Sequence, residues 1–222
     1  MGENSKFVHH VGALGLEDID YFNFKSSSYF QKKYKINFEK KTILVCFHPV
    51  TLEPKWEKIY IKKILDALKF FKNMNIIFTA PNADHGYKDI NKEIINFVKK
   101  KNFCYYIKSF GRDDYLSCLK LSNVILGNSS SGIIEAPSLK TLSINLGNRQ
   151  KGRVKSKSVI DCEIETSKIQ KILKKCLNKE VVNNKNYFYN PYFKNNCSKT
   201  IVKVLEKINF HNLIKKSFFD KI

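Results

Sequence analysis

Three serines stand between two glycines in the stretch GNSSSGIIEAP at 127–137, directly after the apolar run VIL at 124–126. A strand, a glycine turn and a helix start in this order expose unpaired backbone N–H groups beside hydroxyl groups, and both kinds of donor suit a phosphate. Ser129 and Ser130 are therefore candidate phosphate ligands. The alternative is structural, with one serine capping the helix and Gly132 easing its packing. The stretch lacks the lysine of a P-loop, which excludes that motif.

Other side chains near the predicted strand ends could complete such a site. Glu135 falls in the first turns of the helix, where it could support the helix dipole or accept hydrogen bonds from ribose hydroxyls. His48 precedes a proline, which favours an extended backbone, so its imidazole, neutral or protonated, could contact a diphosphate oxygen. The alternative is a histidine packed at a strand end. Arg149 and Arg153 could fork onto phosphate oxygens, or lie on the surface without a ligand.

The elements that must position these residues alternate between short apolar runs and longer amphipathic segments. This alternation predicts an α/β fold, a Rossmann-like parallel sheet with flanking helices, over about 40–180. In the helix expected over 55–72, Trp56 and Ile59 are placed on the apolar face. The expected strands are 42–47, 76–79, 104–107, 124–126 and 142–145, and the other expected helices are 88–101, 113–121, 130–136, 167–177 and 197–208.

Polar loops follow four of these strands in succession. HPVT begins at His48, PNADHG spans 81–86, SFGRDDY spans 109–115, and the serine stretch comes last. Because an open parallel sheet presents its ligand crevice at the carboxyl ends of its strands, the four loops are predicted to converge at one edge.

Bulk composition narrows the class of protein. Lysine and arginine outnumber aspartate and glutamate by 40 to 20, a net charge of +20 that favours anionic partners. A genome rich in A and T would also produce much of this lysine, and no signature motif of an RNA- or DNA-binding protein is present, so a basic nucleic-acid binder ranks last.

Six scattered cysteines indicate reduced core residues. With no signal peptide and no membrane-spanning run, a soluble cytoplasmic protein is expected. The histidine spacing indicates no metal site, and no cofactor is expected.

Four of these motifs together resemble the UDP-N-acetylglucosamine 2-epimerase family, in particular its hydrolysing branch in sialic- and nonulosonic-acid synthesis. They are FHPVTLE at 47–53, PNADHG at 81–86, GNSSSGIIEAP at 127–137 and NLGNRQKGR at 145–153, and the likeness runs over about 5–180. The resemblance implies a glycosyltransferase-B-like fold, in which two Rossmann-type domains hold a sugar nucleotide in the cleft between them and the C-terminal domain contacts most of the nucleotide.

The resemblance also implies roles for single residues. It places His48 and Asn82 in the cleft, Phe110 by the uracil, Ser129 and Ser130 on the diphosphate, Glu135 on the ribose, and Arg149 on a phosphate or the cleft wall. Members eliminate UDP from the substrate to give 2-acetamidoglucal and then add water, which yields N-acetylmannosamine. His48 is the candidate catalytic residue of this chain, and the acid–base carboxylates are expected in an N-terminal domain.

The usual N-terminal Rossmann domain has no counterpart in this sequence, and Met1 resembles an internal methionine of a complete member. We therefore expect a split or truncated gene, or a separate chain that supplies the other half. Residues 1–40 are interpreted as a remnant of the interdomain crossover, 41–195 as the nucleotide-binding domain, and 196–222 as a C-terminal helix that would cross to the missing domain. A catalytically inactive UDP-sugar-binding module is the alternative. The base (uracil or guanine), the exact sugar (N-acetylglucosamine or a diamino-dideoxy relative) and a homo-oligomer are left open.

Overall fold

The computed structural model describes residues 5–50, 56–178 and 186–209 of the 222-residue chain. The chain divides into two compact units. The larger unit is Phe22–Pro191, and the smaller one combines Met1–Tyr21 with Tyr192–Ile222. Residues 22–40 thus belong to the same unit as the sheet. The larger unit ends at Pro191, in the loop that precedes the C-terminal helix.

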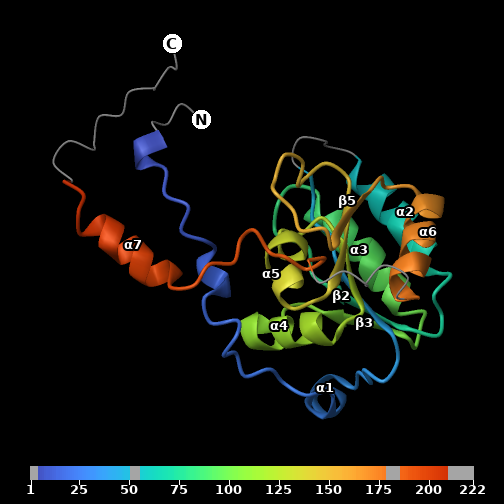
Figure 1. The fold of residues 1–222 in the computed structure, drawn as a ribbon. Helices are drawn as coiled ribbons and strands as arrows, with labels where there is room; N and C mark the ends of the chain where they lie inside the picture. Colours follow the sequence, from blue (N-terminus) through green and yellow to red (C-terminus); the bar gives the residue numbers. More distant parts are fainter. Residues whose placement is uncertain (1–4, 51–55, 179–185, 210–222) are drawn as a thin grey trace. The chain divides into compact units, whose positions relative to one another are not determined.

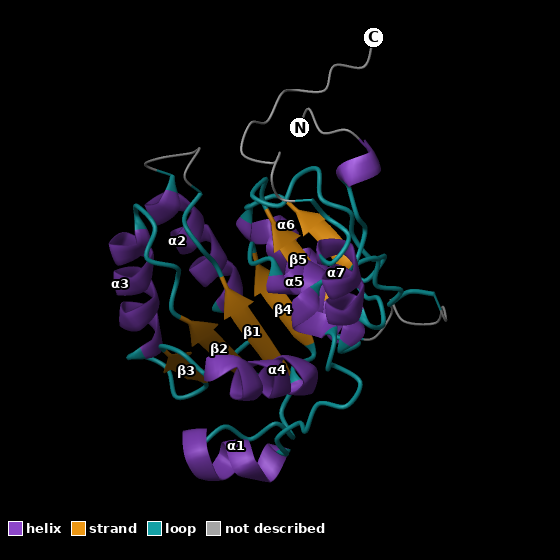
Figure 2. Cartoon of the chain, turned by 90° about the vertical axis from the view of Figure 1, so that its left-hand side faces the viewer, coloured by secondary structure: helices purple, strands orange, loops and turns teal. Residues whose placement is uncertain are grey.

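The larger unit is built on a six-stranded parallel sheet in the order β3-β2-β1-β4-β5-β6. Figure 2 shows these strands side by side. This order places the reversal of the chain's winding between β1 and β4, the point at which doubly wound sheets open a ligand crevice. The strands are β1 (Thr42–Cys46), β2 (Asn75–Thr79), β3 (Cys104–Ile107), β4 (Val124–Gly127), β5 (Leu142–Leu146) and β6 (Val159–Cys162).

Helices cover both faces of the sheet. In Figure 1, α4 (Gly111–Leu121) and α5 (Ser131–Ser138) lie on one side, and α2 (Glu57–Leu68), α3 (Tyr87–Val98) and α6 (Thr166–Leu177) lie on the other. Every residue of β1, β4 and β5 is buried, as expected of parallel strands covered on both faces. The predicted Rossmann-like sheet with flanking helices is therefore present.

Two details of the sequence-based elements were wrong. β6 was not predicted, because its sequence VIDC is half-exposed and interrupted by Asp161, so it lacks the apolar run of a buried strand. In α2 the core face consists of Ile61, Ile64, Leu65 and Leu68, whereas Trp56 and Ile59 are 50% and 44% exposed. The helix begins one residue after Trp56, which instead stacks on the Tyr60 ring.

A polar cluster fastens α1 (Ser27–Tyr34) to α4. The buried carboxylate Asp114 of α4 accepts hydrogen bonds on Oδ2 from the Tyr34 hydroxyl (2.6 Å), the Lys33 ammonium (2.8 Å) and the Tyr29 hydroxyl (3.1 Å). Three donors on one oxygen compensate the burial of its charge. Ser26 caps α1 by accepting from the Tyr29 amide. These contacts explain why residues before β1 belong to the larger unit.

In the smaller unit, an N-terminal segment with the short helices η1 (Ser5–Phe7) and η2 (Leu14–Leu16) is bonded to α7 (Cys197–Leu205). The Glu17 carboxylate accepts from the backbone amide (3.0 Å) and hydroxyl (2.8 Å) of Ser198 in the first turn of α7. A carboxylate at a helix N-terminus is favourable because it meets unpaired amides and the positive end of the dipole. Val202 and Leu205 of α7 are about half exposed. Of the predicted C-terminal segment, residues 210–222 lie outside the described part.

All six cysteines are free thiols in buried positions, which confirms their predicted place in the core. Across the described ranges, no helix is long and apolar enough to cross a membrane.

Candidate functional site

The close approach of β1 and β4 depends on one glycine. Gly127 pairs with Cys46 in the parallel ladder and has φ +149°, a conformation that L side chains rarely adopt. A Cβ on Gly127 would lie 1.9 Å from the Cys46 carbonyl oxygen, far inside van der Waals contact. Glycine is therefore required at this close approach of the two strands, and the next residue, Asn128, bonds to the His48 backbone after β1.

Asn128 ties the loops after β1, β4 and β5 together through its side chain and its backbone carbonyl. It is fully buried, its Oδ1 accepts from the His48 backbone amide at 2.7 Å, and its Nδ2 donates to the His48 carbonyl at 2.8 Å. The Asn128 carbonyl in turn accepts from Arg149 Nη1 (3.0 Å) and from Gln150 Nε2 (2.8 Å). Neither Asn128 nor Gln150 was among the predicted site residues. The available signal was an asparagine inside the quoted serine stretch, immediately after a buried strand.

His48 occupies this crevice as a neutral ring. It is 8% exposed, and its Nδ1 accepts from the Asn82 backbone amide at 3.0 Å. Burial lowers the pKa of His48 from its ordinary 6.5 to about 4, the nearby Arg149 guanidinium adds to this effect, and Asp84 opposes it. Because Nδ1 accepts a hydrogen bond, the single ring proton of the neutral form is on Nε2. Of the two predicted alternatives, the structure favours the neutral imidazole, which can donate one hydrogen bond.

Ser129 and Ser130 form the turn between Asn128 and α5. Within the described residues, the backbone amides of Ser129 and Ser130 have no acceptor, so both donors are available to a ligand. Ser130 makes no side-chain cap hydrogen bond, although Ser129 Oγ accepts from the Ser131 amide at 3.4 Å. Gly132 brings α5 close to β5, since a Cβ there would lie 2.6 Å from the Ser143 hydroxyl. Free amides at a helix start are the kind of donor that binds an anion, and the anion cradle stays a prediction.

The other two predicted site residues have different surroundings. Glu135 lies one turn into α5, where its Oε2 is buried and has no hydrogen-bond partner among the described residues. Burial raises the pKa of the Glu135 carboxyl, and Arg112 partly offsets the effect. Phe110 is buried, and its ring packs edge-on against Tyr34 at a centroid distance of 5.1 Å. This ring therefore belongs to an aromatic cluster with α1, and its place beside a base stays a prediction.

The structure thus joins His48, Asn82 and Arg149 through direct hydrogen bonds or through Asn128, with Ser129 and Ser130 next in the chain. Arg153 is exposed on the loop after β5. In the motif at 47–53, residues 51–53 lie outside the described part of the chain. The described residues contain no group of three or more histidines, cysteines or carboxylates that could hold a metal ion.

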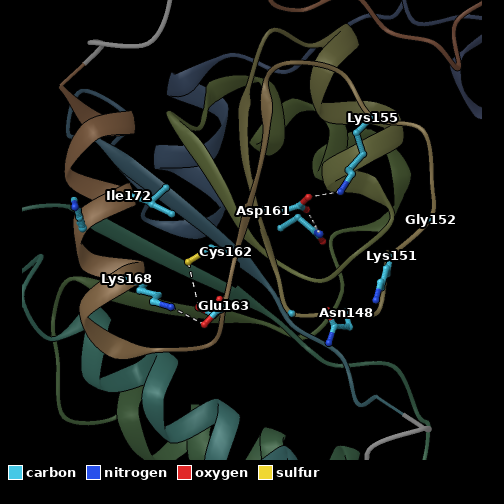
Figure 3. A pocket seen from close by; sticks show the side chains of 12 residues that line it. Asn148, Lys151, Gly152, Lys155, Asp161, Cys162, Glu163, Lys168 and Ile172 are labelled. Carbon is cyan, nitrogen blue, oxygen red and sulfur yellow. Dashed lines mark hydrogen bonds and ion pairs between the residues drawn. The ribbon is translucent and has the colours of Figure 1, made fainter.

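A separate cavity of about 610 Å³ lies at the carboxyl ends of β5 and β6, beside the start of α6. Figure 3 shows Lys155 paired with Asp161 and Lys168 paired with Glu163 at its wall. These ion pairs neutralise two of its lysines. None of the predicted site residues lines this cavity, so it is distinct from the crevice between β1 and β4.

Known proteins match this chain over nearly its full length. The family model described as UDP-N-acetylglucosamine 2-epimerase matches residues 1–206. The chain belongs to the UDP-N-acetylglucosamine 2-epimerase family. A polysialic acid biosynthesis protein P7 of Escherichia coli is 36% identical over 99% of this chain and 56% of its own length. A GDP/UDP-N,N'-diacetylbacillosamine 2-epimerase (hydrolyzing) of Campylobacter jejuni is 35% identical over 99% of this chain and 57% of its own.

Solved structures give the same fold for this family member. The S. aureus MnaA-UDP co-structure superposes with a TM-score of 0.68 at 19% identity, covering 92% of this chain and 54% of that one. The likeness confirms the predicted fold class. The epimerase-family chain spans about half the length of the curated relatives it matches.

Proposed function

We propose that this chain is the nucleotide-holding half of a hydrolysing UDP-N-acetylglucosamine 2-epimerase of the cytoplasm. The observation that carries the proposal is the convergence of donors at the β1–β4 crevice. The neutral His48 ring, the Arg149 guanidinium and the unpaired amides of Ser129 and Ser130 come from three loops and are tied together by Asn128. Such a set of donors binds an anion that has only acceptor atoms, such as a diphosphate.

In the proposed reaction, the bond between sugar carbon 1 and the diphosphate oxygen breaks while a proton leaves carbon 2, which gives 2-acetamidoglucal and UDP. Water then adds its hydroxyl at carbon 1, and carbon 2 regains a proton with inverted configuration, which gives N-acetylmannosamine. The negative charge that develops on the departing diphosphate is stabilised by donors already fixed in place. In this chain those donors are His48 Nε2–H, Arg149 and the amides before α5.

Proton transfer at carbon 2 is assigned to carboxylates outside this chain. Glu135, the carboxylate of α5, is assigned to the ribose hydroxyls, because a hydroxyl donor would satisfy its unpartnered buried Oε2. We infer that a domain corresponding to the other half of the relatives completes the cleft. The C. jejuni relative's name includes GDP and UDP forms of a diacetylated sugar, so a diamino-dideoxy sugar nucleotide is the substrate to compare with UDP-N-acetylglucosamine.

Binding is tested first, by titration calorimetry of the chain with UDP. Ser129→Ala and Arg149→Gln are each expected to weaken UDP binding about ten- to a hundredfold, which is the loss of one hydrogen bond to a charged group. Ser167→Ala, at an exposed serine of α6, is the matched control and is expected to bind UDP like the wild type. Absence of UDP binding by the wild-type chain would refute the proposal.

Turnover is tested second, by measuring N-acetylmannosamine released from UDP-N-acetylglucosamine. The chain alone is expected to be inactive, and activity is expected when it is mixed with the N-terminal half of the C. jejuni relative. Binding of UDP without any recovered turnover would contradict the enzymatic part of the proposal and leave a binding module.

A further inference from the structure

A line of hydroxyl and thiol groups runs from the sheet to the serine turn. The Thr79 hydroxyl at the end of β2 donates to the Cys46 sulfur of β1 at 3.4 Å, and Cys46 Sγ lies 3.6 Å from the Tyr115 hydroxyl of α4. The Tyr115 hydroxyl is hydrogen-bonded to Ser131 Oγ, the first residue of α5. Ser131 Oγ then donates to Ser129 Oγ at 3.2 Å. Four consecutive contacts therefore connect two strands and two helices with the turn that precedes α5.

The direction of every hydrogen bond in this line follows from counting protons. A hydroxyl group has one proton to donate and two lone pairs to accept. Because Ser131 donates its proton to Ser129, the bond between Ser131 and Tyr115 must use the tyrosine proton. The tyrosine oxygen can then only accept from the thiol of Cys46, which itself accepts from Thr79. All protons point toward the serine turn.

Ser129 is the end of this line. Its Oγ accepts from the Ser131 hydroxyl and from the Ser131 amide at 3.4 Å, which occupies both lone pairs. Its own proton has no acceptor anywhere in the described ranges of the chain. Ser129 is thus prepared to donate to a group outside the fold, and a ligand that needs to donate a hydrogen bond at this position finds no acceptor.

The protons of the line stay in place over the physiological pH range. Burial raises the pKa of the Tyr115 hydroxyl well above its usual range, and burial also raises the pKa of the Cys46 thiol. Both groups therefore stay protonated and act as hydrogen-bond donors in the line. Hydrogen bonds in such a chain polarise one another, which strengthens the last donor.

We propose that Tyr115 is a positioning residue that holds the Ser129 hydroxyl as a donor toward the diphosphate of the nucleotide. The inference rests on the proposed function and adds to it a residue that need not touch the ligand. On this proposal, a tyrosine of α4 is the reason that the turn binds ligand groups that accept hydrogen bonds and not groups that donate them. Loss of the Tyr115 hydroxyl is expected to weaken the binding of ligands that carry a diphosphate, whereas a purely structural role would weaken every ligand of the crevice.

The test compares UDP with uridine, which lacks the diphosphate. Tyr115→Phe removes only the hydroxyl and is expected to weaken UDP about three- to tenfold, with uridine binding unchanged, as followed by NMR titration. Tyr106→Phe is the matched control, since it removes a hydroxyl that donates to Asn91 Oδ1 at 2.6 Å in a different part of the unit. Its ratio of UDP to uridine affinity is expected to equal that of the wild type.

A second variant keeps the test informative if Tyr115→Phe folds poorly. Ser131→Ala cuts the same line one bond later, so it should reproduce the loss of UDP affinity. The double variant should lose no more than the larger single loss, because both changes break one chain of bonds. An unchanged ratio of UDP to uridine affinity in either folded variant, or additive losses in the double variant, would overturn the role of Tyr115. If the wild type itself does not bind UDP, the proposed function fails as well.

Discussion

The protonation of His48 makes the stability of the larger unit depend on pH in a calculable way. The histidine pKa is about 4 in the folded chain and 6.5 in its ordinary state. Between these values the unfolded chain binds the proton and the folded one does not, so the free energy of unfolding rises with pH. The contribution is complete above pH 6.5 and is lost as the pH falls toward 4. Its cause is the burial of the ring, strengthened by the nearby Arg149 guanidinium, with Nδ1 already accepting from the Asn82 amide.

The magnitude follows from the difference between the two pKa values. A difference of about 2.5 corresponds to about 3 kcal/mol once the pH is below both pKa values, of which about 2 kcal/mol is lost by pH 5. The assay is urea unfolding at pH 7.5 and pH 5, followed by the fluorescence of Trp56. This single tryptophan lies next to α2 and stacks on Tyr60, so it reports the larger unit.

Comparison with variants isolates the contribution of this histidine from all other titrating groups. His48→Gln cannot gain a proton, so it should lose about 2 kcal/mol less than the wild type between pH 7.5 and pH 5. His85→Gln removes an exposed histidine from the loop after β2 and serves as the matched control for the substitution. If His48→Gln and the wild type lose the same stability on acidification, the ring is not held neutral by burial and the reasoning is refuted.

Three further predictions concern the frame of the crevice, and each is read from urea unfolding midpoints. Asn128→Ala leaves the buried amide and carbonyl of His48 without partners, so it should destabilise the chain by about 3 kcal/mol; a loss below about 1 kcal/mol would show that other groups replace the asparagine. Gly127→Ala introduces a Cβ into the opposite strand and should cost at least about 4 kcal/mol, whereas Gly15→Ala, where a Cβ meets nothing within 4 Å, should stay within about 0.5 kcal/mol. For Glu135→Gln, burial raises the carboxyl pKa, so the ionised wild type is destabilised as the pH rises through that pKa. The variant should therefore be more stable than the wild type at pH 7.5 and gain less at pH 4; an equal gain at both pH values would contradict an ionised buried carboxylate.

Much of the fold could be predicted from local patterns. The buried strands are continuous apolar runs, and the helices carry apolar residues at helical spacing, so five strands and the order of elements were readable. β6 was missed because an edge strand needs fewer apolar side chains, and Asp161 breaks its pattern. Trp56 was misplaced because the first residue of a helical pattern can lie outside the helix and leave its side chain exposed.

The candidate site was predictable only in part. Polar loops after successive parallel strands must meet at one edge, which is why His48 and Asn82 were expected together and are in fact hydrogen-bonded. Asn128 was not expected, because its partner lies 80 positions earlier in the chain and no local pattern records that contact. Tyr115 was predicted only as part of the polar SFGRDDY segment and of a helix at 113–121, without a role of its own. The reason is the same, since its hydroxyl meets Ser131 only after α4 and α5 pack on the same face.

Taken by itself, the amino-acid sequence determined the α/β alternation, the carboxyl-edge loops and the types of donor they carry, because these depend on spacing within a few residues. Only the tertiary structure decided that β1 and β4 are neighbours, that His48 is neutral with its proton on Nε2, and that the Ser129 hydroxyl finds no acceptor among the described residues. The physical reason is that burial, pKa and the direction of a hydrogen bond are properties of the surroundings. Those surroundings exist only when segments distant in the chain have come into contact.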